Sequence, residues 1–131
     1  MTMTHPLDPQ STFLRRALLA DAVLSGATGL MMIAGADVLS GLLDLPAMLL
    51  RAAGLMLVPY VAFVLYAGTR AEIARSAVAA IIVINLAWTA ASIGLLFTGF
   101  VSPNVLGTAF VVFQAAVVGV LAEVQVVGLR R

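Results

Sequence analysis

The stretch Ser76–Phe100 limits most strongly what this chain can fold into, because it is long and apolar enough to cross a lipid bilayer. A helix needs about 20 apolar residues to span roughly 30 Å of hydrocarbon. Polar and aromatic side chains recur within the stretch at helical spacing and share one face, namely Asn85, Trp88, Thr89 and Ser92. An amide in hydrocarbon needs a hydrogen-bonding partner, so we expect Asn85 to face protein or water.

Three further apolar runs accompany this stretch. The chain is 63% hydrophobic and 10% charged, whereas soluble domains are about 45–50% apolar and 25% charged. Its 131 residues hold four spans with short connections. We therefore expect an all-α polytopic membrane protein of one domain, with four transmembrane helices in a bundle. The predicted spans are about residues 17–36, 47–68, 76–98 and 105–128.

The segments outside the spans are short. Residues 1–14 are predicted to form a polar N-terminal tail, with Ser11 or Thr12 capping the first helix. In residues 37–46, leucines and acids alternate at roughly helical spacing, which favours a short segment lying in the membrane interface. Pro59 lies near the middle of the second span and predicts a kink there.

A cleaved signal peptide is an alternative interpretation of the first span. Arg15 and Arg16 precede the apolar run, and Ala34–Ala36 resembles a cleavage site. The apolar run is longer than the roughly 7–15 residues of a signal peptide. We therefore expect the first span to remain in the protein.

Arginine predicts the orientation, since the chain has no lysine. Threading four spans places six arginines on one side: Arg15, Arg16, Arg70, Arg75, Arg130 and Arg131. Arg51 falls alone on the other side, where Asp44 is its expected ionic partner. The positive-inside rule then predicts that both termini lie in the cytoplasm and that the location is a bacterial inner (cytoplasmic) membrane.

Ionisable residues inside spans are functional candidates, because burying a charge there costs about 2.5–3.5 kcal/mol at the helix centre. One hypothesis is a small transporter or channel with a ligand or ion path along Asp21, Ser25, Thr28, Tyr60, Asn85, Trp88, Thr89, Ser92, Gln114 and Glu123. The other is that Asp21 and Glu123 only anchor helices. Both acids are expected about 7–10 Å from the arginine-rich surface, within reach of arginine side chains.

The amides near the middle of the spans also have two interpretations. Asparagine and glutamine often hydrogen bond between helices, and each such bond contributes about 0.6–2 kcal/mol. We expect a bond between Asn85 and Gln114 that joins the third and fourth spans. Trp88 lies unusually deep for a tryptophan and is a candidate for the wall of a pocket.

The last span is patterned on two faces. Gly107, Gln114 and Gln125 lie along one face, while Gly119 and Glu123 lie along roughly the opposite one, together with Ala116. A helix patterned on two faces is expected to contact neighbours on both. The sequence thus favours a non-catalytic membrane protein that is surrounded by lipid and acts as a homo-oligomer or as an accessory subunit of a membrane complex.

The chain lacks the residue types that many enzymatic and cofactor sites use. The chain has no cysteine, and His5, in the tail, is its one histidine. Neither the phosphate-binding nor the dinucleotide-binding glycine pattern occurs. We therefore expect no catalytic site, no metal, no cofactor and no nucleic-acid partner.

Four segments carry a resemblance: FLRRALLADAVLSGATGL, LPAMLLRAAGLMLVPYVAFVLYAGTR, INLAWTAAS and QAAVVGVLAEVQVVGLRR. Together they resemble small uncharacterised bacterial four-helix membrane proteins over nearly the whole chain. That resemblance implies four spans and no assigned activity. Small multidrug exporters are similar in size and carry a glutamate in the first helix, where this chain has Asp21.

Overall fold

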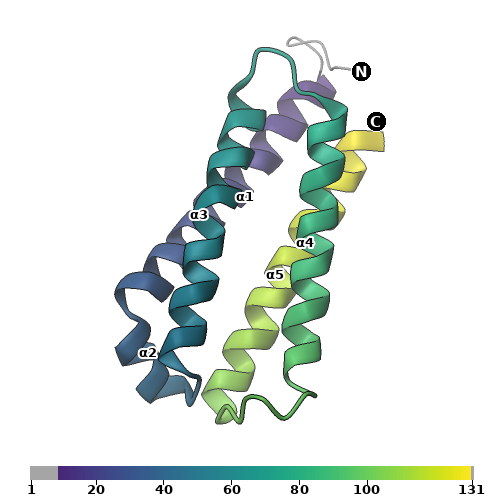
Figure 1. The fold of residues 1–131 in the computed structure, drawn as a ribbon. Coiled ribbons are helices and arrows are strands. Elements are labelled where there is room, and N and C mark those ends of the chain that lie inside the picture. Colours follow the sequence, from purple (N-terminus) through teal and green to yellow (C-terminus); the bar gives the residue numbers. More distant parts are fainter. Residues whose placement is uncertain (1–8, 131) are drawn as a thin grey trace.

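The computed structural model describes residues 9–130, with side chains from Thr12 onward, and consists of helices joined by turns. The helices are α1 (Pro9–Ala34), α2 (Ala36–Leu43), α3 (Ala47–Thr69), α4 (Arg75–Leu95) and α5 (Val105–Arg130). All except α2 are long and apolar enough to cross a membrane, which makes four candidate spans within the described residues. The all-helical fold with four apolar helices that could span a membrane is therefore confirmed (Figure 1).

The helix boundaries differ from the prediction at three places. Helix α1 begins at Pro9, so the predicted tail is wrong over residues 9–14, and residues 1–8 lie outside the described part. Ser11 and Thr12 lie inside α1 and do not cap it. Helix α1 ends at Ala34, two residues before the predicted end of the first span. Helix α4 ends at Leu95, three residues before the predicted end of the third. The chain after α4 turns through Gly99, whose φ of 81° suits glycine.

The segment after the first span is helical, as its leucine spacing predicts. Helix α2 ends at Leu43, and the next residue, Asp44, adopts a left-handed conformation with φ 55°. Arg51 lies 3.5 Å from Asp37, at the start of α2, so the predicted pairing of Arg51 with Asp44 is wrong. Helix α3 continues through Pro59 without interruption, and the kink expected there remains a prediction.

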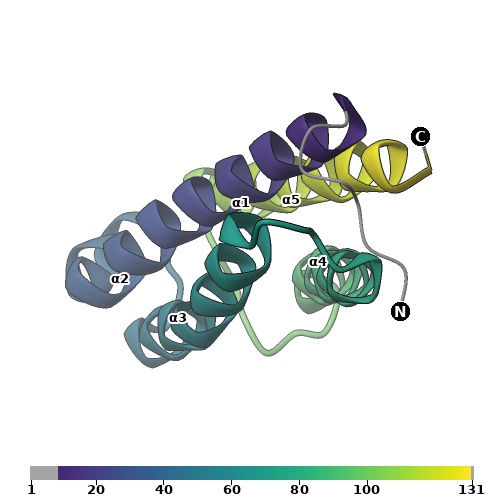
Figure 2. The same ribbon diagram turned by 90° about the horizontal axis from the view of Figure 1, so that it is seen from above.

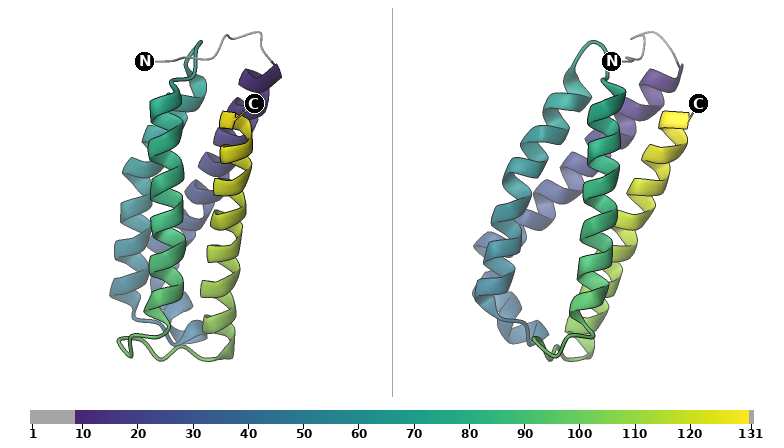
Figure 3. Two further views of the ribbon diagram at one scale, coloured as in Figure 1. Left: turned by 90° about the vertical axis from the view of Figure 1, so that its right-hand side faces the viewer. Right: turned by 45° about the vertical axis from the view of Figure 1, so that its right-hand side comes forward.

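The long helices pack as two pairs. Helix α1 packs along α3 and α4 packs along α5, while α1 and α5 join the pairs (Figures 2 and 3). Gly29 and Gly54 mark the closest approach of α1 and α3, because a Cβ added at Gly54 would lie 2.8 Å from the carbonyl oxygen of Gly29. Helices α3 and α4 are the least closely packed of the neighbouring pairs.

The start of α1 and the end of α5 lie at one end of the molecule, opposite α2 (Figure 1). Two arginines there donate to carbonyl oxygens in the last turns of neighbouring helices. Arg15 donates to the Gly68 oxygen of α3 at 2.5 Å, and Arg75 donates to the Leu129 oxygen of α5. The last carbonyls of a helix need partners from outside the regular hydrogen-bond pattern, and these arginines are such partners.

Two apolar clusters form the core. The first lies nearer the arginine-rich end and includes Leu18, Val64 and Ile81. The second lies nearer α2 and includes Met32 and Leu50. Between Leu18 and Met32, α1 carries buried polar side chains, so the polar site described next separates the two apolar clusters.

Candidate functional site

A polar cluster, formed by Asp21, Ser25, Tyr60, Asn85 and Gln125, joins all four long helices. Asp21 accepts at both of its oxygens: Ser25 donates to Oδ1 at 2.9 Å, and Gln125 Nε2 donates to Oδ2 at 2.8 Å. Asn85 Nδ2 donates to the same Oδ2 at 3.0 Å, and the Tyr60 hydroxyl lies 2.5 Å from it. Asp21 and Gln125 are fully buried, and Asn85 is 3% exposed.

The groups that face Asp21 in this cluster are uncharged. The arginine anchoring expected for Asp21 is wrong, because its donors are two hydroxyls and two amides. The depth expected for Asp21 stays a prediction. Asp21 lies level with Asn85, which sits ten residues into α4.

A single hydroxyl hydrogen in the cluster serves two short oxygen–oxygen contacts. Tyr60 carries one hydroxyl hydrogen, but its oxygen lies 2.5 Å from Asp21 Oδ2 and 2.8 Å from Asn85 Oδ1. When Asp21 is charged, Tyr60 donates to it. When Asp21 carries a proton, Asp21 can donate to Tyr60, and Tyr60 can then donate to Asn85. The same heavy-atom arrangement thus accommodates one added proton.

The amides of the third and fourth spans pair differently from the prediction. Asn85 Nδ2 donates to Gln125 Oε1 at 3.0 Å, so the predicted bond between Asn85 and Gln114 is wrong. Gln114 Oε1 instead accepts from Trp88 Nε1 at 2.8 Å. The two glutamines of α5 lie eleven residues apart, or three helical turns, and only Gln125 is level with Asn85.

The remaining predicted site residues lie apart from the cluster. Thr28 donates to the carbonyl of Leu24 in its own helix, and Thr89 donates to the carbonyl of Asn85. Ser92 lines a pocket next to Trp88. Glu123 is exposed on α5, although its neighbour Ala122 is buried. The structure therefore brings Asp21, Ser25, Tyr60 and Asn85 together, but it does not bring Glu123 to them.

Gln125 is the cluster member that sequence reasoning left out of the site. It was placed on the same face of the last span as Gly107 and Gln114, and this shared face was the available signal. Gly107 and Gln125 are both buried, which confirms that this face points inward. Depth alone gave no reason to choose Gln125, since it lies five residues from the end of α5.

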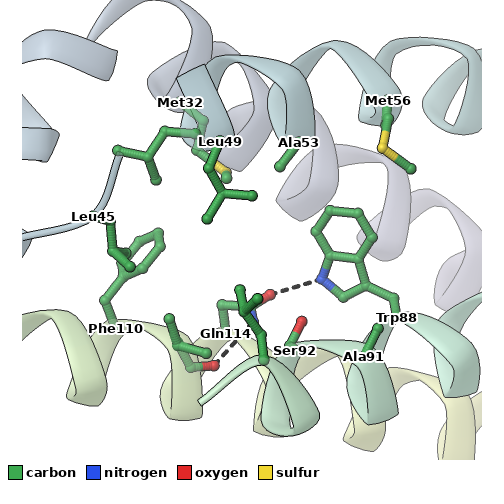
Figure 4. A pocket seen from close by; sticks show the side chains of 13 residues that line it. Met32, Leu45, Leu49, Ala53, Met56, Trp88, Ala91, Ser92, Phe110 and Gln114 are labelled. Atoms are coloured by element: carbon green, nitrogen blue, oxygen red, sulfur yellow. Dashed lines mark hydrogen bonds between the residues drawn. The ribbon is translucent and has the colours of Figure 1, made fainter. Parts of the chain in front are cut away.

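Two cavities between α3 and α4 adjoin the cluster. The lateral pocket, with a volume of about 280 Å³, includes Ala53, Trp88 and Gln114 in its walls (Figure 4). The inner pocket, about 100 Å³, is lined by Tyr60 and Asn85 among others. Met56 and Trp88 line both cavities, which places the lateral pocket next to the polar cluster.

Within the described residues, the side chains able to bind a metal ion are acidic, and they are dispersed over the structure. Over residues 9–130, no three histidine, aspartate or glutamate side chains are grouped as metal ligands. Comparison of the chain with protein-family models, curated proteins and solved structures found no match.

Proposed function

We propose that this protein is a non-catalytic integral membrane protein that acts by associating with other chains in the bilayer, as a homo-oligomer or as an accessory subunit. The proposal includes the predicted setting: a four-helix bundle in a bacterial inner membrane with both termini in the cytoplasm. The separation of Arg51 from the arginines at the opposite end supports this orientation.

The exposed position of Glu123 is the observation that most strongly supports the proposal. It lies seven residues before Arg130, about 10 Å along the helix, and its side chain is exposed. No residue between 12 and 130 forms an ion pair or hydrogen bond with it. A carboxyl group facing lipid at this depth is unfavourable unless another molecule supplies a partner. A second chain on this face of α5 would supply one.

The rest of that face suits a helix partner. Ala116, Val120 and Val127 lie on the same side of α5 as Glu123 and are exposed, with Val120 at 58%. Small residues such as alanine permit close packing of helices in lipid. The polar cluster, by contrast, has all of its buried side-chain polar atoms hydrogen bonded within the described chain. The outer face of α5 is thus the side that still needs a neighbour.

We expect Glu123→Leu to weaken this association about 3- to 30-fold, the equivalent of one interhelical hydrogen bond of about 0.6–2 kcal/mol. Native mass spectrometry of the protein, extracted with its surrounding lipid, would measure the ratio of assembled to single chains. Glu72→Leu is the matched control, because Glu72 is exposed in the connection between α3 and α4. A wild-type chain that is extracted only as a monomer without another protein would contradict the proposal.

A small proton-linked carrier is the second candidate, and the proton-accommodating geometry of Asp21, Tyr60 and Asn85 favours it. We expect such a carrier to dissipate a pH gradient across vesicles at least tenfold faster than protein-free lipid. Asp21→Asn should abolish the effect, whereas Glu123→Gln should keep it. A pH-sensitive dye inside the vesicles measures the rate, and equal rates with and without protein would exclude this candidate.

A further inference from the structure

The lateral pocket lies where the described helices are least closely packed. Its walls come mainly from the first half of α3 and the last half of α4, with Phe110 and Gln114 of α5 behind them. Leu49 lies two residues inside α3, about 3 Å from its end, and Trp88 lies seven residues inside α4, about 10 Å from its end. The pocket therefore extends inward at the depth of the hydrocarbon.

The walls of the pocket offer little to a polar ligand. Trp88 Nε1 is already bonded to Gln114 Oε1 at 2.8 Å, and Gln114 Nε2 donates to the carbonyl oxygen of Val111 at 2.9 Å. The hydroxyl of Ser92 is the other polar side-chain group on the walls, and the rest are apolar (Figure 4). An apolar occupant loses no hydrogen bonds there, whereas a polar one would lose those it makes with water.

The size and the opening of the pocket suit a chain-like molecule. A cavity of about 150 Å³ accommodates benzene, so 280 Å³ has room for about ten carbon atoms. Met56 is 65% exposed, and Ala91 is also exposed, so the pocket opens between α3 and α4 toward the lipid. Phospholipid acyl chains are the surrounding medium of spanning helices at this depth.

We propose that the lateral pocket binds one acyl chain of a membrane phospholipid, with the end of the chain lying against Trp88. The chain enters sideways between α3 and α4 from the leaflet that contains α2. Because Trp88 and Met56 also line the inner pocket, the bound chain covers the approach to Tyr60 and Asn85. This site concerns a lipid ligand and does not depend on the association through α5.

Trp88 reports directly on this site, because it is the only tryptophan of the chain. The probe is phosphatidylcholine with bromine atoms, which quench tryptophan fluorescence, at chosen positions along the acyl chain. In vesicles of this lipid we expect chains brominated near the end to quench Trp88 at least twofold more than chains brominated near the headgroup. Equal quenching by both lipids would overturn the proposal.

Variants of the pocket wall separate a bound chain from bulk lipid. Ala53→Phe should fill the pocket and reduce the quenching at least twofold, and Ala91→Phe, at the opening, should act in the same way if Ala53→Phe does not fold. Ala52→Phe is the matched control, since Ala52 is exposed on α3 and does not line the pocket. Unchanged quenching in both pocket variants would show that Trp88 contacts only bulk lipid and would overturn the proposal.

A separate measurement shows whether the bound acyl chain belongs to a phospholipid or to a free fatty acid. Native mass spectrometry of wild-type protein should show one retained mass of phospholipid size, which Ala53→Phe loses and Ala52→Phe keeps. A retained mass of fatty-acid size would overturn the assignment to phospholipid, and retention of a polar metabolite would overturn the acyl-chain site altogether.

Discussion

Replacing Asp21 by leucine is expected to lower the free energy of unfolding by about 3–5 kcal/mol, because two buried amides and one half-buried hydroxyl would lose their shared acceptor. Tyr60, Asn85 and Gln125 all point to Asp21 Oδ2 at 2.5–3.0 Å. Asn85 is 3% exposed and Gln125 is fully buried, so little water reaches these two amides. The measurement is unfolding in mixed detergent micelles, followed by the fluorescence of Trp88.

Asp21→Asn is the informative companion to this variant. The introduced amide can turn its oxygen toward Tyr60, Asn85 and Gln125 and its nitrogen toward the Ser25 hydroxyl, which now lies 2.9 Å from Oδ1. We therefore expect Asp21→Asn to cost less than about 1 kcal/mol. Equal losses for Asp21→Leu and Asp21→Asn would show that the hydrogen-bond network does not account for the contribution of Asp21.

Replacing Asn85 by leucine is expected to cost about 2–3 kcal/mol by itself, because it removes the donor to Gln125 Oε1 and one donor to Asp21. Combined with Asp21→Leu, it should cost at least about 1 kcal/mol less than the sum of the two single losses. The reason is that each single change leaves unpaired groups that the double change removes together. A double-mutant cycle by the same unfolding assay measures this coupling.

The control for the cycle pairs Asp21→Leu with Gln114→Leu. Gln114 bonds to Trp88 and to its own helix, and it has no bond to the polar cluster. Those two changes should therefore be additive within about 0.5 kcal/mol. Strict additivity of Asp21→Leu with Asn85→Leu as well would mean that the cluster does not act as a unit.

The spans were predictable because they depend on composition over about 20 residues, which neighbouring helices cannot change. The start of α1 was not, since residues 9–12 (PQST) add no apolar signal to the span. The leucine spacing of residues 37–46 predicted the short helix α2, but it did not predict which acid pairs with Arg51. Asp37 and Asp44 both lie near Arg51 in sequence, and only the path of the chain after α2 selects Asp37.

The sequence predicted four of the five members of the polar cluster, all except Gln125, but it did not predict how they pair. Spacing places Asp21 with Ser25 and Asn85 with Thr89, because these pairs lie within single helices. Which glutamine of α5 meets Asn85 depends on how far α5 is shifted along α4, and a shift of three turns exchanges Gln114 for Gln125. The sequence of either helix alone does not determine how far α5 is shifted along α4.

The arginines at the ends of neighbouring helices have a consequence for evolution. Arg15 and Arg75 hold the last carbonyls of α3 and α5, so each of these charges also completes the end of another helix. A lineage that drifted toward the inverted orientation would have to move these arginines to the opposite end. It would lose two helix caps with the same substitutions, so selection for a stable fold also preserves the direction in which the chain is inserted.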